Sequence, residues 1–372
     1  MALILKTRTD VEDLALGCTF FGTGGGGTMQ VGLEMLYPHI DAGKKLTIID
    51  VDTLKDDDWI ACPAYSGTIA PATPEIEVLR TRFPWDFNEL ELKVGLEILE
   101  ENLGVKFAAT VPFELGGINT PAPIDAGVKH GIPCVDGDYA GRAVPELLQS
   151  TTCIKGIPMA PMALVDWYGN RTFVQHVINY EMGERISKAL SEVAWGRLGN
   201  VLFPIQGSTF KDVVIPGTLS KAFDVGKAIR ESRESGDDPA DKIVEKSGGW
   251  ILFRGEVIEK KWENREGYMW GDTLIKGSGL KPGNRLKVFF KNENHILWID
   301  DEPWVMSPDI IEIIEAKSGE PITNTDLKKG DKVSVIGMKT VPIFRTPGGL
   351  NVLGPKHFGY DLKYTPIEEV VS

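Results

Sequence analysis

The stretch that decides the predicted fold runs from Glu114 to Glu146 and reads ELGGINTPAPIDAGVKHGIPCVDGDYAGRAVPE. It follows an apolar run at 105–111 that is typical of a buried strand. Within it, residues 132–136 predict a second short strand, and residues 139–149 predict the helix that follows. Both strands lead into loops that carry carboxylates, at what we expect to be one edge of a sheet. Because open α/β sheets bind ligands beyond the carboxyl ends of their strands, we expect the functional site there.

The residues before this stretch show the same alternation of strands and helices. Strands are expected at 45–51 and 59–62, and an amphipathic helix is expected at 87–103. A loop rich in hydroxyl groups and turn formers, residues 66–71, follows the second of these strands. Such alternation predicts a mostly parallel sheet with helices on its faces. We therefore assign residues 1–167 to an α/β N-terminal domain.

The second half of the chain has a different pattern. Long helices are expected at 180–198 and 218–234. After Gly248, short apolar runs are separated by Gly, Pro, Asn and Asp, which predicts a small antiparallel sandwich or barrel. We assign residues 168–372 to a C-terminal domain that is helical at first and then β-rich. A chain of 372 residues is long enough for two domains that each bury a core.

Composition limits the classes of partner and compartment. The net charge of −13 is spread along the chain, which argues against a nucleic-acid or anionic-membrane partner. The four cysteines contain no CxxC pair, as is usual for free thiols in a reducing cytosol. The first residues have too short an apolar run for a signal peptide, and no stretch approaches the roughly 20 apolar residues of a membrane span. We expect a cytoplasmic homo-oligomer.

A glycine run at 22–27 superficially matches the dinucleotide-binding fingerprint. That motif requires a preceding strand, whereas residues 10–18 predict a helix, so no nicotinamide or flavin is expected. Two alternatives stay open. The backbone N–H groups of Gly24, Gly25, Gly26 and Gly27 can form a cradle for an anion or a carbonyl group. Equally, the run can be a tight turn where helix and sheet backbones approach closely.

Acidic residues and one arginine gather around the expected crevice. Asp136 and Asp138 share parity along a strand, and Arg142 and Glu146 are four residues apart on the expected helix. With Glu114 they make four carboxyl groups that can shift one another's pKa values, so that one becomes a base and another an acid. Alternatively, Asp138 caps the helix and Arg142 and Glu146 form an ordinary surface pair.

Further polar groups follow the Gly-Gly turn. Asn119 and Thr120 come directly after it and can bind polar edges of a ligand or simply begin the next helix. The candidate catalytic residues are therefore Asp136, Asp138, Glu114, Arg142 and Glu146, and the candidate substrate-binding residues are Gly24, Gly25, Gly26, Gly27, Gly116, Gly117, Asn119 and Thr120.

Metal and nucleophile motifs are absent from the sequence. The five histidines, at 39, 130, 176, 295 and 357, form no HxH, HxxxH or HExxH pattern. Ligands that are distant in sequence can still converge in space, so a divalent metal ion stays an open possibility. The sequence has no GxSxG motif, which argues against a serine hydrolase.

Four segments together resemble the S-methyl thiohydantoin desulfurase-like family. They are FGTGGG at 21–26, ELGG at 114–117, DGDYAGRAVPEL at 136–147 and GPKHFGYD at 354–361. The third is the most specific, and the resemblance extends over nearly the whole chain. It implies an α/β N-terminal domain, a β-rich C-terminal domain and removal of sulfur from a thiohydantoin-type five-membered ring.

The chemistry of such a ring suggests roles for the candidates. The carbon that bears sulfur is electrophilic, so hydrolysis needs a base for water and donors for the charge that develops on the ring. Asp136 or Asp138 can be that base, and Arg142 or the glycine-loop amides can stabilise the anion. A bound metal could instead generate hydroxide. The alternative is a non-catalytic binding or regulatory partner of a hydantoin-opening hydrolase, in which the acids only bind ligand or hold structure.

Overall fold

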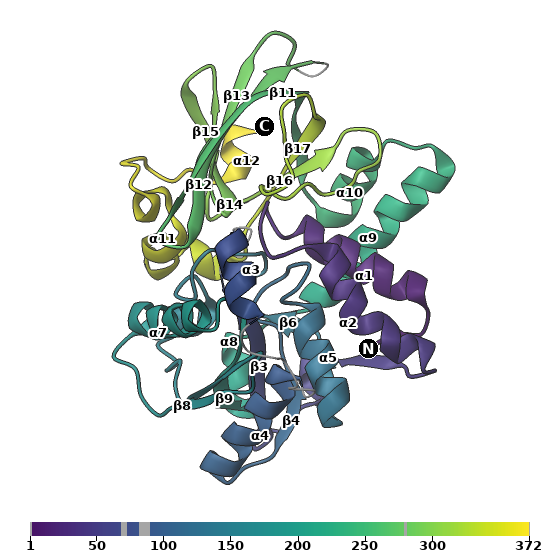
Figure 1. The fold of residues 1–372 in the computed structure, drawn as a ribbon. Coiled ribbons are helices and arrows are strands. Elements are labelled where there is room, and N and C mark those ends of the chain that lie inside the picture. Colours follow the sequence, from purple (N-terminus) through teal and green to yellow (C-terminus); the bar gives the residue numbers. More distant parts are fainter. Residues whose placement is uncertain (1, 68–72, 82–89, 279–280, 372) are drawn as a thin grey trace.

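We describe a computed structural model of the chain that covers residues 2–67, 73–81, 90–278 and 281–371. The chain forms an α/β region and a β-rich region that lie one above the other in Figure 1. This arrangement confirms the predicted fold class. Part of the predicted 66–71 loop, residues 68–71, and part of the predicted 87–103 helix, residues 87–89, fall outside the described residues.

The α/β region is built on an eight-stranded mixed sheet. Four neighbouring strands of this sheet run parallel, and the strand pairs on either side of them are antiparallel. In spatial order the strands are β1 (Leu3–Leu5), β2 (Leu46–Ile49), β5 (Cys134–Val135), β4 (Phe107–Thr110), β3 (Trp59–Ser66), β9 (Leu198–Gln206), β7 (Met162–Asp166) and β8 (Arg171–Val174). The predicted domain boundary at residue 167 falls inside this sheet, because β8 and β9 come after it.

Helices cover both faces of this sheet, as the alternation of side chains along β3 shows. Ala61 packs with α4 (Glu91–Leu103) and α5 (Pro121–His130), whereas its neighbours Ile60 and Cys62 face the opposite core. Alternate residues of a strand point to opposite faces, so a strand covered on both sides is apolar throughout. The second face is covered by α7 (Tyr180–Val193) and α8 (Gly207–Val213).

A helical layer joins the two regions. Helix α1 (Arg8–Phe20) packs along α9 (Thr218–Ser235), and their apolar side chains share a core with Ile310 and Ile336 of the second sheet. The remaining helices are α2 (Met29–Asp41), α3 (Pro74–Arg80), α6 (Thr151–Ile154), α10 (Pro239–Ser247), α11 (Pro347–Leu353) and α12 (Ile367–Val370), with 3-10 turns η1 (Val51–Thr53), η2 (Pro342–Arg345) and η3 (Pro355–Phe358). No described helix is both long and apolar enough to cross a membrane.

The β-rich region is a seven-stranded antiparallel sheet. In spatial order its strands are β15 (Glu302–Met306), β14 (Glu293–Ile299), β13 (Arg285–Lys291), β12 (Tyr268–Gly277), β11 (Trp250–Arg265), β17 (Lys332–Met338) and β16 (Ile310–Glu315). The C-terminal helix α12 packs against the core of this sheet through Ile367 (Figure 1). A two-stranded sheet pairs β6 (Gly137–Asp138) with β10 (Ile215–Pro216).

The helix predicted at 139–149 is wrong. After β6 the chain makes turns as far as Ser150, and helix α6 begins only at Thr151. Asp138 accepts the backbone N–H of Gly141 at 2.9 Å, and Gly141 has a φ of +70°, which closes a tight turn in place of a helical one. The pattern of apolar residues here reflects burial of a compact loop rather than one face of a helix.

Candidate active site

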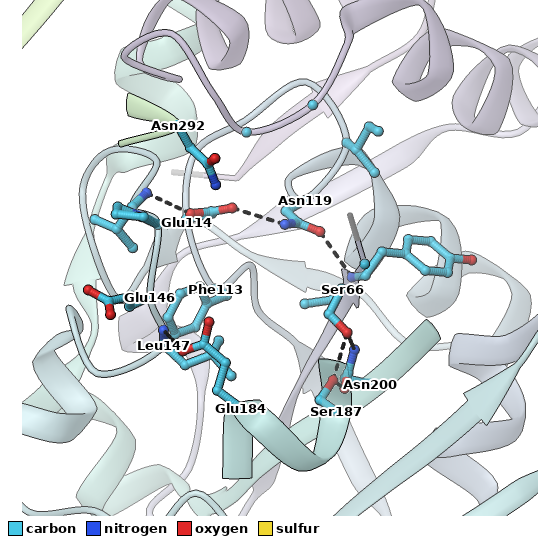
Figure 2. Close-up of a pocket in the computed structure, with 18 of the residues that line it drawn as sticks. Ser66, Phe113, Glu114, Asn119, Glu146, Leu147, Glu184, Ser187, Asn200 and Asn292 are labelled. Carbon is cyan, nitrogen blue, oxygen red and sulfur yellow. Dashed lines mark hydrogen bonds between the residues drawn. The ribbon is translucent and has the colours of Figure 1, made fainter. Parts of the chain in front are cut away.

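A cavity of about 250 Å³ lies where the two regions meet. Figure 2 shows several of its polar side chains, which come from β3 and β9, from the loop after β4, from α7, from the turns after β6 and from the second sheet. The lining residues with polar or charged side chains are Tyr65, Ser66, Glu114, Asn119, Glu146, Glu184, Ser187, Lys188, Arg197, Asn200, Tyr268, Asn292 and Glu293. Cavities with a few convergent polar groups are where ligands usually bind.

Glu114 lies in a loop four residues after β4 and lines this cavity. Its carboxylate accepts a hydrogen bond from Asn119 Nδ2 at 2.9 Å and another from the Val144 N–H at 2.8 Å (Figure 2). Burial raises the pKa of Glu114 to about 7. The two hydrogen bonds favour the charged form and lower the pKa, but burial outweighs them. A carboxyl group in this state can take or give a proton near neutral pH.

Asn119 holds the orientation of Glu114. Its Oδ1 accepts the Tyr65 N–H at 3.0 Å, so its amide nitrogen is the atom that faces the carboxylate. This fixed amide joins the end of β3 to the loop after β4. Both ends of the Asn119 amide already have partners in the protein. Its role as a ligand-binding residue stays a prediction.

Three residues from β3, α7 and β9 form a closed ring of hydrogen bonds across the cavity. Ser187 donates to Asn200 Oδ1 at 2.6 Å, and Asn200 Nδ2 donates to Ser66 at 2.9 Å. The remaining 2.6 Å bond joins the two hydroxyl groups, and its hydrogen belongs to Ser66 because Ser187 has used its own. The partners of Ser66 are a serine and an asparagine, neither of which is a base, so this ring suits binding rather than nucleophilic attack.

A second carboxylate of the cavity, Glu184 on α7, is fully bonded. It accepts hydrogen bonds from the Leu147 N–H at 3.0 Å and from the Tyr268 hydroxyl at 2.5 Å. Lys188 lies 3.2 Å from the same carboxylate and 3.1 Å above the Tyr268 ring. Tyr268 begins β12 at the tip of the β11–β12 hairpin, so the second sheet closes one side of the cavity.

Glu146 lines the cavity. It does not pair with Arg142, although their spacing on the expected helix would have allowed a pair. It forms an ion pair with Lys291 at 2.9 Å and a hydrogen bond with His357 at 2.5 Å. Burial alone would raise the pKa of Glu146, but the bond from His357 and the charge of Lys291 outweigh it and lower the pKa to about 2. The segment that carries His357 therefore packs back against the junction, and Phe358 stacks on His295 with ring centroids 3.9 Å apart.

Asp136 and Asp138 are not among the cavity-lining residues. Asp136 accepts the N–H groups of Leu219 at 2.9 Å and Ser220 at 3.0 Å, and it thereby caps the N-terminus of α9. Asp138 is fully buried in the turn that Gly141 closes, and burial raises its pKa well above the usual range. Asp136 thus caps a helix and Asp138 closes a turn. A capping role of this kind was the alternative that the sequence analysis gave for Asp138.

Arg142 is also absent from the cavity wall. Its guanidinium is fully buried and donates to Thr23 Oγ1 at 3.0 Å and to the carbonyl groups of Ala143, Asn294 and Asp309 at 3.0–3.2 Å. These partners come from both regions, so Arg142 ties the glycine loop to the second sheet. Burial lowers the pKa of Arg142, while several surrounding carboxyl groups raise it.

The glycine run at 24–27 and the Gly116–Gly117 pair pack against each other through their backbones. A side chain on Gly116 would lie 2.5 Å from the carbonyl oxygen of Gly26, a contact that only glycine permits. Gly26 and Gly27 line the cavity, whereas Gly24, Gly25, Gly116 and Gly117 are not among the lining residues. Thr120 is buried and bonds to the backbone of Gly116 and Glu114. The close approach of two backbones thus explains Gly26, Gly116 and Gly117, whereas side chains of Asn324, Glu293 and Ile118 occupy the space beside Gly24, Gly25 and Gly27.

The structure offers no preformed metal centre in the part of the chain that it describes. No three or more His, Cys, Asp or Glu side chains there are grouped so that they could hold a metal ion. The cavity carboxylates Glu146 and Glu184 already bind lysine, histidine and tyrosine. We therefore derive no chemical step from a metal.

Comparisons with known proteins identify the family. Models described as the S-Me-THD-like N-terminal and C-terminal domains match residues 9–176 and 178–367. The chain belongs to the S-Me-THD-like family. This is the S-methyl thiohydantoin desulfurase-like family that the four sequence segments indicated.

The fold of this S-Me-THD-like protein has been seen before. A crystal structure of a protein from Chromobacterium violaceum is similar over 98% of this chain and 100% of that chain, with a TM-score of 0.75 and 22% sequence identity. At this identity the likeness shows the fold alone. The comparison with curated proteins found no match.

Several cavity residues of this S-Me-THD-like protein were not predicted from the sequence. Glu184 and Lys188 are four apart on α7 and look like an ordinary surface pair. Glu293 belongs to the polar turn KNEN at 291–294, which resembles a solvated hairpin turn. The one available signal was the position of that polar turn between two strongly apolar strands. The polar lining residues missed are Tyr65, Ser66, Glu184, Ser187, Lys188, Arg197, Asn200, Tyr268, Asn292 and Glu293.

Proposed function

We propose that the protein is a hydrolase that removes sulfur, as sulfide or methanethiol, from a thiohydantoin-type five-membered ring and leaves a hydantoin. Its substrate is then a small heterocycle that binds in the cavity at the junction of the two regions. The observation that carries this proposal is Glu114, a buried carboxyl group in the cavity wall with a pKa of about 7. Membership of the S-Me-THD-like family supports the class of reaction.

Glu114 has the properties that the base of this reaction needs. A general base works best when its pKa lies near the working pH, since it is then both available and strong enough. The bonds from Asn119 and Val144 fix the direction of its lone pairs. A water molecule beside this carboxylate would attack the ring carbon that bears sulfur, and Glu114 would accept the proton that the water loses.

The rest of the cavity wall offers groups that can hold the ring. Asn292 Oδ1 accepts the Met269 N–H at 2.8 Å, and Figure 2 shows its amide directed toward Glu114. Its Nδ2 group is thus a donor for a ring carbonyl or for developing negative charge. Ser66 and Ser187 supply acceptor lone pairs for ring N–H groups.

The competing proposal is a non-catalytic partner of a hydantoin-opening hydrolase. It is favoured by the positions of Asp136, Asp138 and Arg142, which are buried and bonded within the protein rather than gathered at the cavity. In this case the cavity would bind the ring and Glu114 would serve only to orient it.

An activity assay with matched variants separates the two proposals. Purified protein is incubated with S-methyl thiohydantoin and with unsubstituted thiohydantoin, with and without divalent metal ions, and released thiol and sulfide are measured. We expect release by the wild type, a loss of about 10²–10⁴-fold in Glu114→Gln and near-normal turnover per folded molecule in Asp136→Asn, which alters a carboxyl outside the cavity. Binding of the rings without release would support the non-catalytic partner.

A further inference from the structure

The cavity wall contains a further buried carboxyl group, Glu293, at the turn between β13 and β14. Glu293 is only 2% exposed. Its Oε2 atom is buried and has no hydrogen-bond partner among the described residues. Buried polar atoms nearly always have a partner, so an unpaired carboxyl oxygen in a cavity wall indicates a bond that is made to a ligand.

The glycine loop and the turn hold Glu293 in this position. A side chain on Gly25 would lie 1.9 Å from Glu293 Oε1, so the absence of a side chain at residue 25 makes room for the carboxyl group. The loop is fastened to the second sheet because the carbonyl of Thr23 accepts the Asn294 N–H at 2.5 Å and that of Gly24 accepts the Asn324 N–H at 2.6 Å. The glycine loop therefore positions a carboxyl group from the other half of the chain.

The turn itself is held in an unusual backbone conformation. Asn292 has a φ of +56°, and its side chain and backbone both bond to Met269 at 2.8 Å. Non-glycine residues rarely adopt positive φ and do so where the surrounding structure fixes them, often next to a functional site. Asn292 thus fixes the direction in which Glu293 leaves the strand.

We propose that Glu293 is the second catalytic carboxyl group of the cavity and that it donates a proton to the ring nitrogen while Glu114 accepts the proton of the attacking water. This role rests on the proposed function. The hydrogen bonds indicate which carboxyl group is the base and which is the acid. Glu114 accepts two N–H groups, which stabilise a carboxylate, whereas Glu293 Oε2 accepts no hydrogen bond within the part of the chain that the structure describes. Burial, together with the nearby charge of Glu114, also raises the pKa of Glu293, against the opposing charges of Arg142 and Lys291.

The atoms balance for an S-methylated ring. The water oxygen bonds to the carbon that bears sulfur and gives one proton to Glu114. Glu293 gives its proton to the ring nitrogen, which takes the electron pair of the C=N bond. The C–S bond then breaks as the new hydroxyl becomes a carbonyl. The hydroxyl proton passes to Glu293, and Glu114 protonates the departing methanethiolate. Both carboxyl groups end as they began, and one water has replaced methanethiol.

The experiment compares the pH profiles of kcat/KM for methanethiol release in the wild type, Glu293→Gln and Glu312→Gln. Glu312 is the matched control, because it is also buried near Arg142 with an unpaired oxygen, yet it does not line the cavity. If Glu293 is the acid, we expect wild-type activity to fall on the alkaline side as this carboxyl group ionises. We expect Glu293→Gln to lose this alkaline limb and to be about 10²–10⁴-fold slower at its maximum. Glu312→Gln should keep the wild-type profile.

Two results would overturn the role of Glu293, and they are distinguishable. If the wild type releases methanethiol and Glu293→Gln keeps both its rate and its alkaline limb, the proposed function stands and Glu293 is not the acid. If the wild type releases no methanethiol, the proposed function and the role of Glu293 both fail. Circular dichroism and thermal melting of each variant confirm that rates are compared between folded proteins.

Discussion

Replacement of Glu114 by Gln should change the way in which stability depends on pH. In the folded protein the pKa of Glu114 is about 7, against an ordinary value of 4.5. A carboxyl group whose pKa is raised by folding contributes stability that is complete below its unfolded value and is lost as the pH rises through its folded value. The wild type should therefore lose stability between pH 4.5 and about 7 as Glu114 ionises, whereas Glu114→Gln has no carboxyl group to ionise at this position.

The magnitude follows from the size of the shift. Each pKa unit corresponds to about 1.4 kcal/mol, so the shift of Glu114 amounts to about 3 kcal/mol of unfolding free energy across this range. Glutamine also places an NH2 group against one of the two N–H donors, from Asn119 or Val144, which costs stability at every pH. We therefore compare the change in unfolding free energy from low to high pH in the two proteins. The pH-independent cost of the glutamine cancels in this change, and the effect of Glu114 ionisation is left.

The assay is urea unfolding of the wild type and Glu114→Gln at a series of pH values from below 4.5 to above 7. We expect the unfolding free energy of the wild type to fall by about 3 kcal/mol relative to the variant as the pH rises. Asp136→Asn serves as a control for other groups that titrate in the same range. Parallel curves for the wild type and Glu114→Gln would refute the claim that Glu114 titrates near neutral pH.

Other carboxyl and guanidinium groups should show structural rather than chemical effects. Asp136→Asn should lower the unfolding free energy by about 1 kcal/mol, because it weakens the cap of α9, and should leave turnover per folded molecule unchanged; urea unfolding and thiol release on one sample check both. Arg142→Lys should lower the melting temperature, since lysine lacks the fork that reaches acceptors in both regions, and an unchanged melting temperature would contradict that role. Glu146→Gln should cost about 3 kcal/mol near neutral pH, because Lys291 is left buried without its partner. This cost should shrink as the pH falls toward 2, where wild-type Glu146 itself becomes protonated, and a cost independent of pH would argue against the ion pair with Lys291.

The order of strands and helices could largely be predicted from the sequence. The buried strand before Glu114, the helix before the glycine run and the β-rich second half follow from apolar periodicity, and each is present. The helix at 139–149 was wrong because periodicity cannot distinguish one face of a helix from a buried loop. That loop is held by the local turn of Asp138 and Gly141 and by bonds from Arg142 to distant residues, such as Asn294, that sequence spacing does not reveal.

The candidate site was predicted in part. Glu114, Asn119, Glu146, Gly26 and Gly27 do line one cavity, because they follow the strand ends and loops where ligands bind in α/β folds. The other half of the cavity comes from α7 and from two hairpin turns. Helix α7 reaches the site by packing on the first sheet, and the two hairpin turns reach it only through the packing of the second sheet on the first. A pattern of residues along one chain cannot predict either contact.

The source of the oxygen in the product tests the central claim most directly. The wild type is incubated with S-methyl thiohydantoin in water labelled with heavy oxygen, and released methanethiol and the mass of the ring product are measured together. Hydrolytic desulfuration predicts one labelled oxygen in an intact hydantoin for each methanethiol released, and the loss of both signals in Glu114→Gln. Methanethiol release without labelled hydantoin, or bound ring that stays unchanged, would contradict the account.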